Sequence, residues 1–155
     1  MDQEKLALKT ALNFINRRWY SAFQIIKKLQ DRDIAEAQIT EAVTFLKEKN
    51  FLNDVRYARF FIKDRLNFRP KAKFVINSEL KQKGISPNDI ESAWQEVNDE
   101  LEVDEYQIAS NLAIKKAKSC RNLDPEVRKR RIISFLARKG YNYDVIKKAL
   151  AKLDQ

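Results

Sequence analysis

The residue types that most often perform catalysis are scarce in this chain of 155 residues. It has no histidine, the side chain most used for proton transfer near neutral pH and for binding metals. Its single cysteine, Cys120, therefore has no histidine to activate it and no second cysteine for a disulfide or a metal site. The two glycines are too few for a phosphate-binding loop, and adjacent carboxylates such as Asp104 and Glu105 lie on different sides of a helix. The sequence predicts a protein that is not an enzyme and uses no metal or cofactor.

Basic residues are the chemically distinctive group, and they are clustered. The formal net charge of +9 favours acidic partners. Residues 56–83 contain nine basic and two acidic residues, and residues 115–152 contain thirteen basic and three acidic ones. Between them, residues 86–105 contain eight acidic residues and no basic one. The basic regions predict surfaces that bind phosphates or an acidic protein, while the acidic block either neutralises itself in solvent or shields a basic face until a partner competes.

Helices must position these charges, because apolar residues recur at helical spacing throughout the chain. Ser86-Pro87 and Asp124-Pro125 each place a capping residue before a proline at the first helical position. Gly84 and Gly140 follow basic residues, as expected of glycines that end helices in the left-handed conformation. We predict nine helices, over residues 4–16, 20–31, 36–50, 54–68, 71–83, 87–98, 103–119, 125–139 and 142–153.

The sequence repeats itself three times. Segments that begin at Ile25, Ile76 and Ile132 keep the same apolar phase without a gap over more than twenty residues. We predict an all-α fold of three tandem three-helix repeats that form an elongated, curved modular array. The alternative is a single irregular helical bundle whose apolar positions agree by chance. The predicted repeats are 1–52, 53–101 and 102–155, and the matched positions include Leu29, Leu80 and Leu136, then Ala42, Ala93 and Ala149.

Two predicted helices present basic stripes. At 100° per residue, Arg56, Arg59 and Lys63 share one face of the helix over 54–68. On the helix over 125–139, Ile132 and Leu136 point inward. The residues that point outward together are Arg130, Arg131, Ser134 and Arg138. Rigid helices would hold these charges at fixed spacing, which suits a phosphate backbone or an acidic groove. The alternative is that both stripes are solvated faces that keep the protein dissolved.

The aromatic residues and the apolar runs allow simpler predictions. Trp94 falls on a repeated apolar position, so we predict that it packs in the core. For Trp19 and Tyr20, packing inside is favoured over stacking on a partner.

No apolar run approaches the ~20 residues that cross a bilayer, so no membrane partner is expected. The first residues lack the pattern of a signal peptide, so we expect a cytoplasmic location.

Several segments resemble the RecX family of regulatory proteins. They are Asn53–Ala58, Glu79–Ile85 and Phe135–Tyr141, and Arg17–Ser21 resembles the N-terminal Arg/Ser segment of that family. The similarity runs from about Lys5 to Leu150. The resemblance implies three tandem three-helix repeats in a non-catalytic bacterial regulator of the RecA recombinase. Such a regulator binds the RecA filament on single-stranded DNA, inhibits its ATPase, extension and strand exchange, and so modulates recombination, DNA repair and the SOS response.

The sequence departs from the family pattern in its details. The segment before Pro70 lacks the glycine often found there, and Gln24 stands where the family commonly has glutamate. Asp33 occupies the position that Gly84 and Gly140 hold in the other repeats.

The expected binding residues combine the basic stripes with neighbouring lysines. The expected partners are the RecA filament, single-stranded DNA and, more weakly, double-stranded DNA, and the chain is expected to act as a monomer without a cofactor. A sequence-independent nucleic-acid-binding helical protein with no RecA partner would show the same charge pattern, so that alternative stays open. The expected residues are Arg56, Arg59, Lys63, Lys71, Lys73 and Lys83 in the middle repeat, and Arg130, Arg131, Arg138 and Lys139 in the last.

Overall fold

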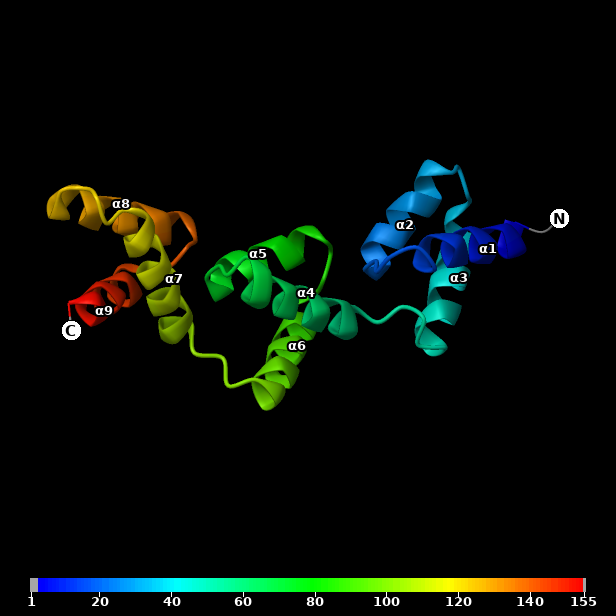
Figure 1. The fold of residues 1–155 in the computed structure, drawn as a ribbon. Helices are drawn as coiled ribbons and strands as arrows, with labels where there is room; N and C mark the ends of the chain where they lie inside the picture. Colours follow the sequence, from blue (N-terminus) through cyan, green and yellow to red (C-terminus); the bar gives the residue numbers. More distant parts are fainter. Residues whose placement is uncertain (1–2, 155) are drawn as a thin grey trace. The chain divides into compact units, whose positions relative to one another are not determined.

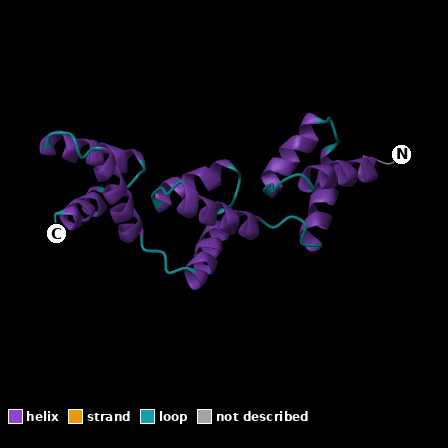
Figure 2. Ribbon diagram, in the orientation of Figure 1, coloured by secondary structure: helices purple, strands orange, loops and turns teal. Residues whose placement is uncertain are grey.

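The computed structural model describes residues 3–154, and over that range it consists of helices joined by loops, with no strand (Figures 1 and 2). The all-α prediction is therefore confirmed, and each predicted helix agrees with an observed one to within two residues at either end. No helix in this range combines the length and the hydropathy that crossing a membrane requires. The helices are α1 (Gln3–Ile15), α2 (Ala22–Asp31), α3 (Glu36–Glu48), α4 (Asp54–Phe68), α5 (Lys73–Gln82), α6 (Pro87–Glu100), α7 (Glu105–Ser119), α8 (Pro125–Arg138) and α9 (Tyr143–Leu153).

The three repeats bury the same positions, which confirms the threefold repeat of three helices. In the first repeat α1 packs against α2 and α3, and in the last α7 packs against α8 and α9. The repeated leucines are fully buried, and the repeated isoleucines and alanines are at most 5% exposed. Trp94 is 4% exposed, so its predicted place in the core is confirmed. The matched buried residues are Ile25, Ile76 and Ile132, then Leu29, Leu80 and Leu136, then Ala42, Ala93 and Ala149.

The described residues group into two compact units whose limits cut through the middle repeat. The first unit extends to Ile62 and also contains Glu79–Val97. The second unit contains Lys63–Ser78 and the residues from Asn98 onward. Each unit therefore contains one contact between the second helices of successive repeats. We call these two contacts the first and the second joint.

The first joint is built around Ser21, which is fully buried. Its Oγ accepts a hydrogen bond from the Gln24 backbone N–H at 3.2 Å, and the Gln24 side chain accepts one from the Ser21 N–H at 3.0 Å. This capping box starts α2, and Gln24 performs in it the acceptor role that a glutamate would perform. The same Ser21 Oγ donates to the Lys83 carbonyl, at 2.6 Å, just after the end of α5. The Ser21 hydroxyl thus caps α2 and also forms a hydrogen bond to the neighbouring repeat.

A carboxylate supports the same joint. The Ala22 N–H donates to Oδ1 of Asp54, at the start of α4, at 2.9 Å. Burial raises the pKa of the Asp54 carboxyl, and the hydrogen bond from Ala22 opposes that rise. The first turn of α2 therefore contacts both α4 and the end of α5.

The second joint repeats this geometry with a backbone donor. Ala72 aligns with Ser21, and Lys139 aligns with Lys83. The Ala72 N–H donates to the Lys139 carbonyl at 2.9 Å. The start of one repeat's second helix is thus bound to the end of the next repeat's second helix at both joints.

Both joints require glycine after the accepting carbonyl. Gly84 and Gly140 have φ of +80° and +93°, in the left-handed region, as predicted. A Cβ at Gly84 would lie 2.2 Å from the Phe23 Cβ, and one at Gly140 would lie 2.2 Å from the Val75 Cγ2. In the first repeat Asp33 also has a positive φ, of 58°, but it is exposed. Aspartate is tolerated there because the position requires only a left-handed backbone, and no other repeat packs against it among the described residues.

One predicted helix cap is wrong. Ser86 Oγ accepts a hydrogen bond from the Asp89 N–H at 3.2 Å, as expected. The Asp124 side chain accepts no cap hydrogen bond, although Pro125 does begin α8. Because residues 124–126 are exposed, water can satisfy the free N–H groups of that first turn.

Replacing Gly140 by alanine should lower the free energy of unfolding by about 2–5 kcal/mol, since left-handed backbone costs an L-residue ~1–2 kcal/mol and overpacking ~1–3 kcal/mol. Urea denaturation followed by circular dichroism measures the loss. Asp33→Gly is the matched control, because it changes a left-handed residue at an exposed position, and its effect should stay within about 1 kcal/mol. Equal stability of Gly140→Ala and the wild type would contradict the tight joint.

Replacing Tyr141 by phenylalanine should raise the free energy of unfolding by about 1–3 kcal/mol, since its hydroxyl is buried without a hydrogen-bond partner in the described part of the chain. Burial, together with the Glu105 carboxylate, raises the pKa of Tyr141. The advantage of the variant should therefore grow above pH ~10, where an unfolded tyrosine ionises and the folded one must stay neutral. Tyr106→Phe is the control, because the Tyr106 hydroxyl donates to the Lys148 carbonyl at 3.2 Å, and it should show no gain.

Candidate functional site

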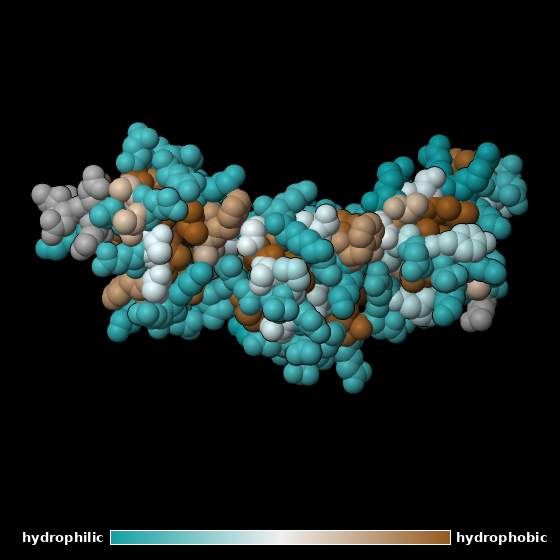
Figure 3. All heavy atoms as spheres, turned by 180° about the vertical axis from the view of Figure 1, so that it is seen from behind, coloured by the Kyte–Doolittle hydropathy of each residue, from teal (hydrophilic) through white to brown (hydrophobic). Residues whose placement is uncertain are grey.

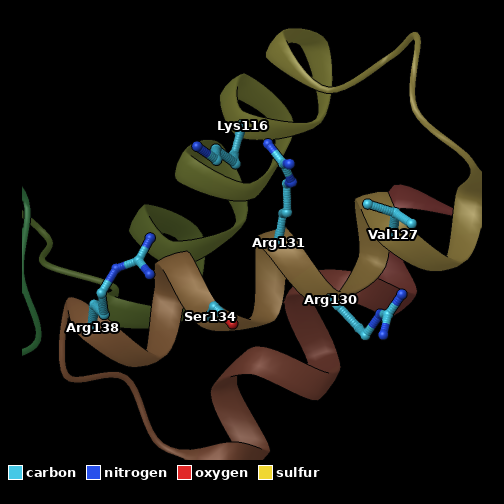
Figure 4. A pocket seen from close by; sticks show the side chains of 6 residues that line it. All are labelled: Lys116, Val127, Arg130, Arg131, Ser134 and Arg138. Atoms are coloured by element: carbon cyan, nitrogen blue, oxygen red, sulfur yellow. The ribbon is translucent and has the colours of Figure 1, made fainter.

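An open hollow of about 510 Å³ lies on the surface of α7 and α8 (Figure 4). Ile132 and Leu136 bury the opposite side of α8 in the core of the last repeat, together with Ala109 and Ala113 of α7. This burial turns the basic side of α8 outward. We call the site the α7–α8 hollow, and it is lined by Lys116, Val127, Arg130, Arg131, Ser134 and Arg138.

The basic side chains of the α7–α8 hollow do not all point the same way. Arg131 and Arg138 extend to the side of α8 on which Lys116 lies, whereas Arg130 extends away from them (Figure 4). All three arginines are exposed, and no carboxylate of residues 3–154 lines the hollow. A guanidinium can form paired hydrogen bonds to a phosphate or a carboxylate, and the Ser134 hydroxyl can add another. The arrangement is suited to binding an extended polyanion.

The sequence predicted the arginines of this hollow but not Lys116. Lys116 lies on α7, and its Nζ is 5.1 Å from the centre of the Phe135 ring. The basic run around Lys115–Lys118 was the available signal, but it does not show which lysine faces α8. Lys139 was predicted and does not line the hollow. Its Nζ lies 5.5 Å from the same ring, and its carbonyl belongs to the second joint.

The stripe on α4 is partly neutralised by the acidic block. Arg59 Nη1 lies 3.6 Å from Glu96 Oε2, and Lys63 forms an ion pair with Glu100. Both glutamates are on α6 and are half exposed, at 49% each for the side chain. Partly exposed pairs of this kind contribute only about 0–1 kcal/mol each, so a stronger acidic partner can displace the glutamates. These ion pairs agree with both alternatives for the acidic block: that it neutralises itself in solvent, or that it shields a basic face until a partner competes.

The remaining predicted residues are dispersed. The Lys73 N–H donates to Glu105 Oε1 at 3.3 Å and its side chain is exposed, whereas Lys71 is half-buried. Lys83 Nζ lies 5.6 Å from the centre of the Phe61 ring. The predicted set is therefore not one site: Arg130, Arg131 and Arg138 share a hollow, and the others have separate surroundings.

A second hollow, of about 470 Å³, contains Arg56. It is lined by residues 15–20 and 50–53 and by Arg56, and we call it the Trp19 hollow. Trp19 is 53% exposed, so the prediction that it packs inside is wrong; its ring lies beside Phe60 and the Arg56 guanidinium. Tyr20 is half-buried and packs edge-on against Phe14 at 6.1 Å, as predicted.

Hydrophobic side chains are exposed elsewhere as well. On the face shown in Figure 3 they form separate patches surrounded by hydrophilic side chains. Phe68, Phe74 and Tyr143 are the most exposed of the large hydrophobic side chains described, each at 68% or more.

Cys120 is a buried free thiol. Within residues 3–154 no three His, Cys, Asp or Glu side chains converge as metal ligands would.

Three family models match this chain, and together they cover most of it. They are described as the first, second and third three-helix domains of RecX, and they match residues 7–46, 53–93 and 102–150 respectively. Each match corresponds to one repeat of three helices.

Relatives named Regulatory protein RecX are similar over nearly the whole chain. The protein of Leuconostoc mesenteroides is 30% identical, over 90% of this chain and 51% of its own length. That of Clostridium botulinum strain Eklund 17B is 37% identical, over 90% and 64%. That of Finegoldia magna is 32% identical, over 91% and 68%. The chain thus spans about half to two thirds of the length of these curated relatives.

Solved structures agree with the sequence relatives. The crystal structure of RecX from Lactobacillus salivarius matches with a TM-score of 0.84 and 27% identity, over 99% of this chain and 97% of that one. A second structure, described as the crystal structure of regulatory protein RecX, matches with a TM-score of 0.77 and 25% identity, over 94% and 70%.

The double variant Glu96→Gln/Glu100→Gln should bind a polyanion such as a 20-residue oligo(dT) several-fold more tightly, because it frees Arg59 and Lys63. The slope of log affinity against log salt should steepen by up to ~1.4, about 0.7 for each freed cation. Titration at several salt concentrations measures both quantities, and the free energy of unfolding should change by less than about 1 kcal/mol per pair.

Glu91→Gln/Glu102→Gln is the matched control, because it removes the same charge from exposed positions that form no ion pair with described residues. Its effect on affinity should be smaller. An equal gain in the two variants would mean that net charge alone acts, and that the ion pairs shield nothing.

Proposed function

This chain belongs to the RecX family, and from that premise we propose that it is a non-catalytic regulator of the RecA recombinase in the bacterial cytoplasm. It binds the RecA filament on single-stranded DNA and inhibits ATP hydrolysis, filament extension and strand exchange. It thereby modulates recombination and DNA repair. The observation that supports this assignment most directly is the α7–α8 hollow, where Lys116, Arg131 and Arg138 face one side without a carboxylate among them.

The physical basis of the inhibition is occupancy. A packed helix fixes the backbone positions from which its cations extend, so several weak contacts to phosphates or to acidic protein side chains can form together and add effectively. The middle repeat adds Arg59 and Lys63 once the partner displaces Glu96 and Glu100. A chain bound along the filament would obstruct the entry of a homologous duplex and the addition of further RecA subunits.

Binding of this kind requires no chemistry from the chain. The composition supports that reading, since there is no histidine and only one cysteine. An interaction of many charges should instead weaken steeply as salt rises, because each phosphate contact releases bound counterions. Salt dependence is therefore the property that distinguishes this mechanism from a tight apolar interface.

The variant Arg131→Glu/Arg138→Glu should raise the concentration needed for half-inhibition of RecA ATPase on single-stranded DNA by about tenfold or more for each residue changed, since each lost charged hydrogen bond costs ~1.5–3 kcal/mol. Lys5→Glu/Lys9→Glu is the matched control, because it makes the same charge change at exposed positions of α1. It should inhibit nearly as the wild type does. Circular dichroism checks that helicity is kept, and unchanged inhibition by the α8 variant would show that this surface is not the contact.

A sequence-independent nucleic-acid-binding protein is the second candidate, since a basic hollow without carboxylates also suits DNA alone. Capture of purified RecA by the immobilised chain in the absence of DNA separates the two functions. We expect capture that falls with rising salt. Retention of DNA together with no retention of RecA would favour the second candidate and contradict the first.

A further inference from the structure

The Trp19 hollow is separate from the α7–α8 hollow and lies within the first compact unit. Two stretches far apart in the sequence form it, the link from α1 to α2 and the link from α3 to α4. Its volume of about 470 Å³ is within the ~300–1,000 Å³ typical of ligand sites. Nothing in the proposed contact of α8 with a filament uses these residues.

The Trp19 ring is exposed and yet held in position. Its centre lies 5.0 Å from that of Phe60, at an interplanar angle of 33°, and the Arg56 guanidinium lies 5.2 Å from the indole centre. Arg56 is itself fixed, because Nη2 donates to the Asn50 carbonyl at 3.0 Å. Phe51, beside it, is 51% exposed. The hollow thus presents aromatic surface whose orientation is set before any ligand arrives.

The charge of the hollow is positive. Arg17, Arg18 and Arg56 line it, and the lining residues include no carboxylate among the described side chains. The nearest carboxylate in sequence, Asp54, accepts the hydrogen bond from the Ala22 N–H and belongs to the first joint. Since no lining carboxylate among the described residues neutralises Arg17 and Arg18, an anion in the hollow would meet cations that are free to bind it.

We propose that the Trp19 hollow binds single-stranded nucleic acid, with one base stacked against the Trp19 ring and the adjoining phosphates held by Arg17 and Arg18. Aromatic rings beside a basic surface are how proteins hold single strands without reading their sequence. An acidic polypeptide would use the arginines but would have no need of an exposed indole. A duplex would keep its bases stacked inside, out of reach of Trp19. This site goes beyond the proposed filament contact, because it makes the first repeat a second point of attachment to DNA.

The test uses the full chain and its own fluorescence, without RecA. Trp94 is 4% exposed and Trp19 is 53% exposed, so a change of emission on binding reports on Trp19. Oligo(dT) of 20 residues should quench the emission, and an abasic oligomer with the same number of phosphates should quench it much less. Trp19→Ala should weaken binding of oligo(dT), measured by anisotropy of a labelled strand, by roughly 5- to 150-fold and leave binding of the abasic oligomer unchanged. Trp19→Phe, which keeps a ring, should retain most of the affinity.

Removal of the two arginines should affect binding differently from removal of the Trp19 ring. Arg17→Ala/Arg18→Ala should weaken binding of both oligomers and lower the slope of log affinity against log salt by ~1.4, about 0.7 for each phosphate contact. Unchanged oligo(dT) affinity in Trp19→Ala would overturn the stacking site. Quenching by poly-glutamate but not by oligo(dT) would identify an acidic polypeptide as the occupant and would also overturn it. Because RecA is absent, a failure here leaves the α8 contact intact, and Arg131→Glu/Arg138→Glu should still show oligo(dT) quenching of Trp19.

Discussion

The packing of successive repeats depends on one hydrogen bond to a backbone carbonyl, which occurs at both joints. The carbonyl just after the second helix of a repeat, at Lys83 or Lys139, accepts a hydrogen bond from the start of the preceding repeat's second helix. The approach is so close that the next residue must have no Cβ, and the chain has its two glycines at those two positions. Since a buried, hydrogen-bonded joint has few alternative geometries, each joint fixes how the two second helices that meet in it contact one another.

The fold could be predicted because its signals are local and periodic. Ile76, Leu80 and Ala93 have counterparts in the other repeats, and all of them are buried. The left-handed ends at Gly84 and Gly140 were also predictable, because a glycine after a basic last turn is a helix-stop signal. What the residues around these glycines contact was not predictable. The nearness of Phe23 to Gly84 arises from packing between segments about sixty residues apart.

The candidate site was predicted only in part, and for the same reason. Helix geometry identified the outward side of α8, but the opposing Lys116 comes from another helix. On α4 the periodicity gave a basic stripe, while the pairing of Arg59 with Glu96 depends on how α6 lies beside it. For Trp19 the sequence favoured packing inside over stacking on a partner. It is exposed because it lies in the link between α1 and α2, where its ring is beside Phe60 and Arg56 on the surface of α4.

Asp33 separates the two demands that the glycines meet. It has the same left-handed backbone as Gly84 and Gly140, but it is exposed and carries a Cβ and a charge. Left-handed backbone alone therefore does not require glycine at this place in the repeat. The requirement comes from the neighbouring repeat, because Phe23 or Val75 lies where a Cβ of residue 84 or 140 would be. Mutation of either glycine would therefore disturb a helix end and a contact between repeats at once.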